Sequence, residues 1–479
     1  MSKTLYAGVA RRIINPPLGI NKAGLRLFAD PIQAVESDLT ATVLVLSDGA
    51  AKVAIIACDL VVIPTQTACE VRRRVAEAIG SSASHVLLNF SHNHSSPALP
   101  GWTVDPPDQA RYKSKYQEKL FRWLVEAAQE ADRKLEPARI GAGWGASDIG
   151  VYRRETGPDG RDVLGEVPDH PIDPAVGVIR VDDLEGQPIA VLFSYGCHPV
   201  TVGPLSMVAS TDFPGPARQV IEGSLGGMAI FLQACGGNIN PRVGIGYEVD
   251  CRESKLRVGA TLGGEALKVA ADIRTHVRQG KRIPLGNVPN ILFTPWEPVE
   301  GETCTYLGAV EEIVPLEFIE LPSLSEAQAI QEKWHQTVDE RRTKGAQPWE
   351  IRVAAHFANW ADKLVQAVQD GEPTLDLVLQ AVRINDIVLA SLNMEAFFET
   401  GLAVKAKSQF KDTQVLGYSN GVVGYLPRAE DYPPDGWKVS EVYAVPDLYV
   451  QSYTLPVALH PDSEKLAVDR LTAMIQQLQ

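Results

Sequence analysis

The stretch HVLLNFSHNHSSP, residues 85–97, decides how this sequence is interpreted, because an apolar run passes directly into a cluster of polar groups. Residues 85–90 predict a short buried strand. In the extended chain that follows, His92 and His94 point to the same side. Two imidazoles that converge on one point suit Zn²⁺, which binds the neutral imidazole nitrogen. A bare His-x-His is equally compatible with two surface histidines in a polar loop, so this hypothesis needs support from elsewhere in the chain.

Strand-like and helix-like segments alternate outward from this stretch in both directions. The sequence predicts hairpins at 39–46 with 51–63 and at 375–383 with 387–392, and strands at 176–181, 189–195 and 228–233. It predicts helices at 65–79, 108–131, 215–223, 251–273, 323–342, 397–408 and 463–478. Residues 280–305 are rich in Pro and Gly and predict a long surface loop. We therefore expect a mixed α/β (α+β) fold and one large domain over residues 1–479, without a clear internal boundary.

Composition excludes several classes of protein. The 479 residues carry a formal net charge of −14, which argues against a nucleic-acid partner, because such binding rests on clustered Lys and Arg. We see no signal peptide and no apolar run long enough for a membrane span. The six cysteines lack CxxC spacing and predict free thiols. These features predict a cytoplasmic protein, and they leave the oligomeric state open.

Three further segments place polar groups after apolar runs. His198 follows a predicted strand in FSYGCHP (193–199) and is a candidate ligand from a second strand. Gly236 and Gly237 form a turn in QACGGNINP (233–241) that can bring backbone N–H groups close to a ligand. Glu395 follows another apolar run and either caps a helix or supplies a carboxylate to a metal. Taken singly, each segment also fits an ordinary structural role.

Taken in this order, the segments resemble the catalytic domain of the neutral ceramidases. That family carries a Thr-His-Thr-His-Ser-Gly-Pro motif, to which residues 91–97 are similar, and the N-terminal residues 7–24 also resemble its opening. The resemblance covers nearly the whole chain, and it lacks only the additional C-terminal β-sandwich of the lipid-hydrolysing members. It implies a zinc site with four ligands, which carry over onto His92, His198, Glu395 and Tyr425. It also implies an active-site role for His94.

One departure from the family concerns the substrate. The family segment Gly-Asp-Val-Ser-Pro-Asn contains a serine important for amide cleavage, whereas this chain has Asn240 at that position and Asn238 in place of the aspartate. An asparagine is no nucleophile, although its amide can hold a substrate or an oxyanion. We therefore expect a zinc-activated water to cleave an amide (N-acyl) bond of a small soluble substrate, with Asn240 as a catalytic residue. We expect Gly236, Gly237 and Asn238 to contact that substrate.

Other functions remain open at this stage. The same metal site is compatible with ester, lactone or glycosidic cleavage, and the asparagine at 240 is compatible with a family member that binds a small molecule without catalysis. The run QACGG (233–237) also fits a cysteine-hydrolase pattern, with Cys235 as nucleophile and His198 as base. The exact metal stays open too, because these ligand types also accept Mn²⁺ or Fe²⁺.

Overall fold

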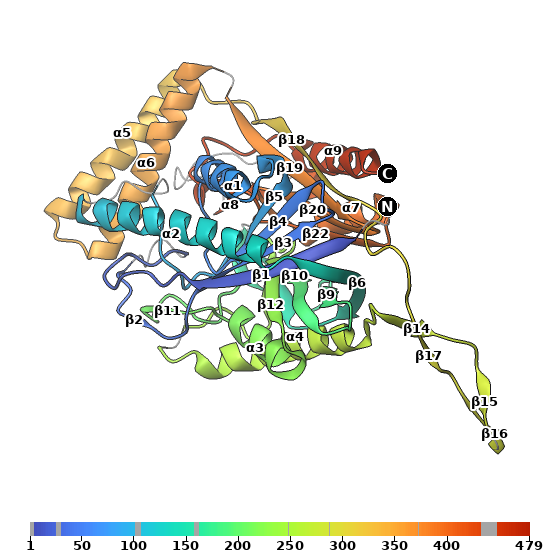
Figure 1. The fold of residues 1–479 in the computed structure, drawn as a ribbon. Helices are drawn as coiled ribbons and strands as arrows, with labels where there is room; N and C mark the ends of the chain where they lie inside the picture. Colours follow the sequence, from blue (N-terminus) through green and yellow to red (C-terminus); the bar gives the residue numbers. More distant parts are fainter. Residues whose placement is uncertain are drawn as a thin grey trace.

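The computed structural model describes residues 4–24, 30–100, 107–157, 162–247, 249–286, 288–371, 373–432 and 448–479. An eight-stranded mixed sheet lies at its centre, in the order β12-β10-β9-β6-β1-β3-β4-β5 (Figure 1). β4 and β5 are parallel neighbours, as are β10 and β12. The strands of this sheet are β1 (Leu5–Ile13), β3 (Thr40–Ser47), β4 (Lys52–Cys58), β5 (Val86–Phe90), β6 (Glu136–Ala146), β9 (Ala175–Asp183), β10 (Pro188–Tyr195) and β12 (Met228–Gln233).

A second sheet of four strands packs face to face on the first. Its order is β18 (Leu307–Glu317), β19 (Thr374–Ile384), β20 (Ile387–Leu392) and β22 (Asp412–Leu416). Leu46 and Ile55 of the first sheet share one buried core with Val382 and Leu389 of the second. Successive side chains of a strand point to opposite faces of the sheet. The residues of β3 and β4 that point away from this shared core therefore enter a second core, between the first sheet and the helices.

Helices cover the outer faces of both sheets, so the molecule has four layers of the order helix, sheet, sheet, helix. On the first sheet lie α1 (Thr65–Ile79), α2 (Pro107–Arg133), α3 (Pro214–Leu225) and α4 (Arg252–Asp272). On the second lie α7 (Phe398–Lys407) and α9 (Ser463–Gln477). α5 (Leu324–Thr343) and α6 (Pro348–Asp370) pack on each other as a helical hairpin with its own core, at the upper left of Figure 1. None of the helices in the described part of the chain is long and apolar enough to cross a bilayer.

Short strand pairs complete the fold around the loops. They are β2 (Ala34–Val35) with β11 (Val208–Ala209), β7 (Gly150–Thr156) with β8 (Asp162–Val167) and β13 (Ile239–Pro241), and β21 (Glu395–Ala396) with β23 (Tyr425–Leu426). Single helical turns lie at η2 (Ala83–His85), η3 (Ala429–Asp431) and α8 (Leu448–Gln451).

The two edge strands of the first sheet, β5 and β12, come together through one side chain. The Asn89 amide donates to the Gln233 carbonyl oxygen at 3.2 Å and accepts from the Gln233 N–H at 2.8 Å. The same amide also donates to the Gly417 carbonyl oxygen at 3.0 Å. These bonds bring the loops after β5, β10 and β12, which carry the polar motifs, to one place.

Most predicted elements are confirmed. The helix expected at 65–79 is α1, and Gly80 ends it in the left-handed conformation with φ 68°. Ser323 and Glu326 form the expected capping box at the start of α5. The hairpin at 375–392 is β19–β20, with Asn385 at φ 53° in its turn. The six cysteines are free thiols, five of them buried.

The loop predicted at residues 280–305 is wrong for most of its length, and only residues 299–305 form a loop without strands. The chain instead forms a protruding hairpin, here called the arm (residues 277–298), which extends to the lower right in Figure 1. Its strands are β14 (Val277–Gln279), β15 (Ile283–Leu285), β16 (Val288–Phe293) and β17 (Trp296–Pro298). Proline is tolerated here because each strand of a two-stranded hairpin has one edge without a partner.

Candidate metal centre

His92 lies in the loop that follows β5 and has a left-handed backbone, with φ 59°. Strain of this kind in a non-glycine residue is typical of functional sites. Its Nδ1 lies 3.0 Å from the Val61 carbonyl oxygen. Because a carbonyl oxygen can only accept, Nδ1 carries the proton and Nε2 presents a lone pair to the interior. The ring of Tyr418 packs against the imidazole with centroids 4.4 Å apart.

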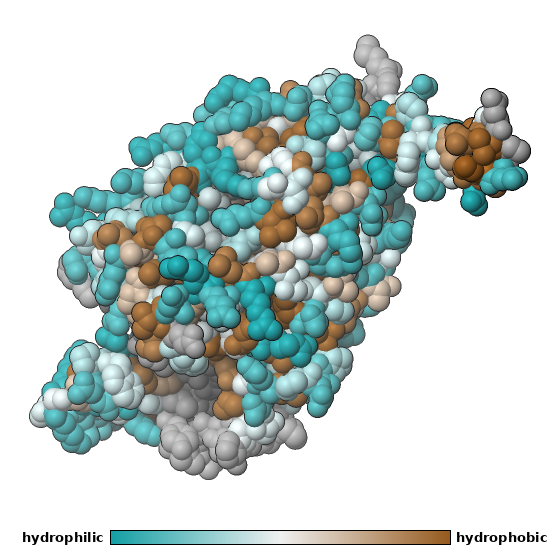
Figure 2. Space-filling view, turned by 90° about the horizontal axis from the view of Figure 1, so that it is seen from below, coloured by the Kyte–Doolittle hydropathy of each residue, from teal (hydrophilic) through white to brown (hydrophobic). Residues whose placement is uncertain are grey.

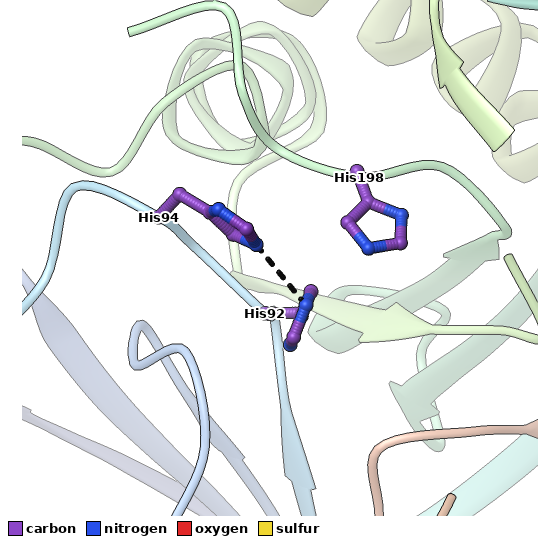
Figure 3. A group of neighbouring side chains, drawn as sticks. All are labelled: His92, His94 and His198. Atoms are coloured by element: carbon purple, nitrogen blue, oxygen red, sulfur yellow. Dashed lines mark hydrogen bonds between the residues drawn. The ribbon is translucent and has the colours of Figure 1, made fainter. Parts of the chain in front are cut away.

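His198 is held in the same way from the loop after β10. Its Nδ1 lies 2.9 Å from the carbonyl oxygen of Gly236 and 3.1 Å from that of Ile239, so its Nε2 is also unprotonated. His94 places its Nε2 3.1 Å from the Nε2 of His92 (Figure 3). The ligand atoms of the three histidines lie within 4.8 Å of one another, which is a geometry able to hold a metal ion.

Glu395 completes the cluster from the second sheet. Its Oε2 lies 3.0 Å from the Nε2 of His198 and 3.4 Å from the Nε2 of His92. Tyr453 donates to its other oxygen at 2.5 Å. Glu395 does not begin a helix, because it lies in β21 and pairs in register with Tyr425 of β23. The helix-capping interpretation is therefore wrong, and the carboxylate is buried beside the imidazoles.

This arrangement sets two imidazole lone pairs against one carboxylate oxygen. Such acceptors repel one another unless a cation lies among them. Burial lowers the pKa of His92, and burial together with Arg153 lowers the pKa of His198 to about 3, so near neutral pH neither ring supplies that cation by taking up a proton. The donor set of neutral imidazoles and a carboxylate fits a divalent metal ion such as Zn²⁺.

The remaining charges of the cluster are consistent with this conclusion. Burial alone would raise the pKa of Glu395, but His92, His198 and Arg153 overcome that effect and lower it, so the carboxylate is ionised. Burial, together with the other two histidines, holds the pKa of His94 well below its ordinary value. The Nδ1 of His94 is buried and makes no hydrogen bond to any residue that the structure describes.

Arg153 on β7 is a central residue that the sequence did not reveal. Its guanidinium donates to the Tyr425 hydroxyl at 3.0 Å, to the Gly237 carbonyl oxygen at 2.7 Å and to the Asn240 side-chain oxygen at 3.2 Å. Burial alone would lower its pKa, but Tyr425 and other acidic groups raise it, so the cation persists. In the sequence it is one of two adjacent arginines in an ordinary strand, and no local signal distinguishes it.

The expected substrate contacts lie in the loop after β12. Asn240 lies in β13 and faces Arg153, as described above. The Asn238 side chain donates to Glu399 at 2.9 Å and accepts from the Phe398 N–H at 3.1 Å. The Gly237 N–H donates to the Ala396 carbonyl oxygen at 2.8 Å. The Gly236 carbonyl oxygen holds His198, so this turn braces the cluster chiefly through carbonyl groups rather than N–H groups.

Cys235 and His198 do not form a catalytic pair. The Cys235 thiol points to the Val415 carbonyl oxygen at 3.8 Å, whereas the ring nitrogens of His198 face the carbonyl oxygens of Gly236 and Ile239 and the carboxylate of Glu395. Burial raises the pKa of Cys235 to about 12, which keeps the thiol protonated and unreactive. The cysteine-hydrolase alternative is therefore not supported.

A narrow pocket reaches the cluster beside His94. Lys22, Val200, Val202 and Ile245 line it. The Lys22 ammonium donates to the carbonyl oxygens of Gly203 and Ser206, both at 2.8 Å. The space in this pocket is about 10 Å³, which is room for about one water molecule beside His94.

Comparisons with known proteins point in one direction. No family model matches the chain. Over 192 residues, the chain is 26% identical to neutral ceramidase A of Dictyostelium discoideum, a match that covers 36% of this chain and 25% of that protein. The aligned part thus spans a quarter of the length of this relative.

Two solved structures extend the comparison to the whole fold. The crystal structure of neutral ceramidase from Pseudomonas aeruginosa superposes with a TM-score of 0.65 at 17% identity, over 100% of this chain and 75% of that one. A ceramidase complexed with C2 gives a TM-score of 0.66 at 16% identity, over 99% and 75%. The chain shares the mixed α/β fold of these two structures, and part of its sequence is similar to a neutral ceramidase.

Proposed function

We propose that the chain is a zinc-dependent hydrolase that cleaves an amide (N-acyl) bond of a small substrate. The observation that supports it best is the convergence of His92, His198 and Glu395, three buried acceptors that require a cation among them. Tyr425 is the proposed fourth ligand, and it is the strand partner of Glu395. Similarity to neutral ceramidases favours an amide as the bond that is cleaved.

Each residue around the proposed metal site has its own role in hydrolysis. When bound, zinc supplies a Lewis acid and lowers the pKa of a water ligand. His94 moves a proton at its Nδ1, which has no partner within the described residues. Arg153, a buried cation beside Tyr425, stabilises negative charge that develops on the substrate carbonyl oxygen. Asn240 orients Arg153 through its side-chain oxygen.

The proposal also covers the size of the substrate, the cellular compartment and the extent of the catalytic unit. Asn240 at the position of the family serine favours a small N-acyl compound over a bulky lipid. Gly236, Gly237 and Asn238 support the cluster and border the substrate. We place the reaction in the cytoplasm and propose that residues 1–479 act as one catalytic unit. Ester, lactone or glycosidic cleavage by the same site is the alternative chemistry.

Metal content tests the proposal directly. We expect about one zinc per chain in the purified protein by mass spectrometry, as a single site of this type holds one ion. His92→Ala and His198→Ala should lose both metal and hydrolysis of N-acyl substrates. His335→Ala, on the exposed face of α5, is the matched control and should keep both.

The outcomes separate the alternatives. A protein that stays metal-free after incubation with zinc would contradict the assigned site. A zinc-loaded protein that binds N-acyl compounds without turnover would instead indicate a non-catalytic binding protein. Cleavage of esters but not of amides would keep the proposed metal site but replace the amide with an ester as the bond that the protein cleaves.

A further inference from the structure

The arm, residues 277–298, stands apart from the body of the molecule. β14 pairs with β17 and β15 with β16, and these strands make their main contacts with one another. At its root, the Arg274 guanidinium lies over the Trp296 ring, 4.2 Å from the centroid. Beyond that point the hairpin extends into solvent (Figure 1). An isolated two-stranded hairpin is only marginally stable in water, so the arm needs a covering surface.

The tip of the arm is apolar on both faces. Residues 283–296 contain no charged side chain. Ile291 and Leu292 are adjacent in β16, so they point to opposite faces, and each is 49% exposed. Five more large apolar side chains of the arm are exposed in the same way: Ile283, Leu285, Val288, Phe293 and Trp296. Figure 2 shows a brown group at the end of the protruding arm, while the body has a mixed teal, white and brown surface. Patches of this kind mark interaction sites.

The charge of the arm is opposite to that of the whole chain. Between residues 277 and 298, three basic residues stand against one acidic residue, whereas the chain has a net charge of −14. The basic residues are Arg278, Lys281 and Arg282, and the acidic residue is Glu297. Lys281 and Arg282 make no ion pair with any residue that the structure describes, and both are exposed. The partner that complements this arm is a protein surface that carries acidic side chains around an apolar patch.

We propose that the arm docks on a second copy of this chain and makes the protein a homodimer. The acidic body of the other copy supplies the opposite charge, and a reciprocal exchange of arms covers both faces of each tip. In such a two-fold arrangement every copy contributes both its own arm and the surface that covers the other arm. Each copy thus buries two areas, its own arm and the surface that covers the other arm, and both add to the roughly 800 Å² per partner that a stable interface needs.

The test is the mass of the full chain in solution. Size-exclusion chromatography with light scattering, at micromolar concentration, should give twice the chain mass of 52.0 kDa. Ile291→Glu places a carboxylate in the apolar tip and should give the single-chain mass. Ile313→Glu is the matched control, since Ile313 is 58% exposed on β18 of the body, and it should remain dimeric.

A second variant tests the charge argument. Lys281→Glu combined with Arg282→Glu should weaken dimerisation by about tenfold or more, because like charges then face each other across the interface. Unchanged circular dichroism would confirm that each variant is folded. A parent of single-chain mass at every concentration would overturn the proposal, as would an Ile291→Glu variant that stays dimeric. Binding of a single-chain parent to anionic lipid vesicles through the arm would overturn it in favour of a membrane surface.

Discussion

Two β-hairpins that are both rich in large apolar residues have opposite environments in this protein. β19–β20 belongs to the second sheet and buries its apolar residues against the first sheet on one face and against α9 on the other. Its residues Leu379, Val388 and Leu392 are at most 1% exposed. Seven large apolar residues of the arm are between 39% and 49% exposed. The first hairpin continues into Asn393 and Glu395 and so delivers a carboxylate to the histidines, whereas the second carries no part of the cluster. An apolar hairpin sequence therefore predicts a covered surface, but the sequence alone does not say whether this chain or another provides the cover.

The largest expected difference between the two hairpins is in stability. Leu379→Ala should lower the free energy of unfolding by about 2–5 kcal/mol, since it leaves a cavity among fully buried side chains. Leu285→Ala, the same change in the arm, should alter it by less than about 0.5 kcal/mol, because the side chain is already 45% exposed. Guanidinium unfolding of both variants at low protein concentration measures the difference. Equal losses would show that the arm packs on its own chain.

The contrast between the hairpins also explains what the sequence could predict. Local signals gave α1, with its apolar face and Gly80, and the capping box of Ser323 and Glu326. The arm was missed because its prolines and glycines are typical of loops, while the strand pairing that overrides them is formed only in the folded chain. The Pro and Gly content of a segment is thus a poor predictor of whether it forms strands.

The candidate site shows the same limit. His92, His94 and His198 follow apolar strands, so the sequence pointed to them directly, and the structure brings them together. For Glu395 the sequence left a helix cap and a metal ligand open, because its pairing with Tyr425, thirty positions along the chain, is not a local feature. Arg153 was missed for the same reason, since only the fold shows that this arginine is buried among Tyr425, Asn240 and Gly237.

An intermediate effect is expected from the same carboxylate change in the two regions. Glu395→Gln keeps the shape of the side chain but removes the charge that faces two imidazole nitrogens. Zinc affinity should fall by about 100-fold, close to 2.7 kcal/mol, and hydrolysis should fall with it. Glu297→Gln in the arm, where the carboxylate lies 3.7 Å from Arg278 and is exposed, should leave both unchanged. Competition with a chelator of known affinity measures the first quantity. Full zinc affinity in Glu395→Gln would remove this residue from the ligand set.

The effect that is smallest per pH unit concerns two lysines, one buried beside the pocket and one exposed in the arm. Burial lowers the pKa of Lys22 from 10.5 to about 8, so between these values the unfolded chain binds a proton that the folded chain has released. Unfolding then takes up a proton, and the free energy of unfolding gains up to about 1.4 kcal/mol per pH unit from this group as the pH rises from 8 to 10.5. Lys22→Met should lose that part of the pH dependence, whereas Lys281→Met should keep it. Urea unfolding of the three proteins across this pH range measures how the free energy of unfolding depends on pH. Equal slopes for the parent and Lys22→Met would show that Lys22 stays charged in its pocket. In that case the carbonyl oxygens of Gly203 and Ser206 compensate for its burial.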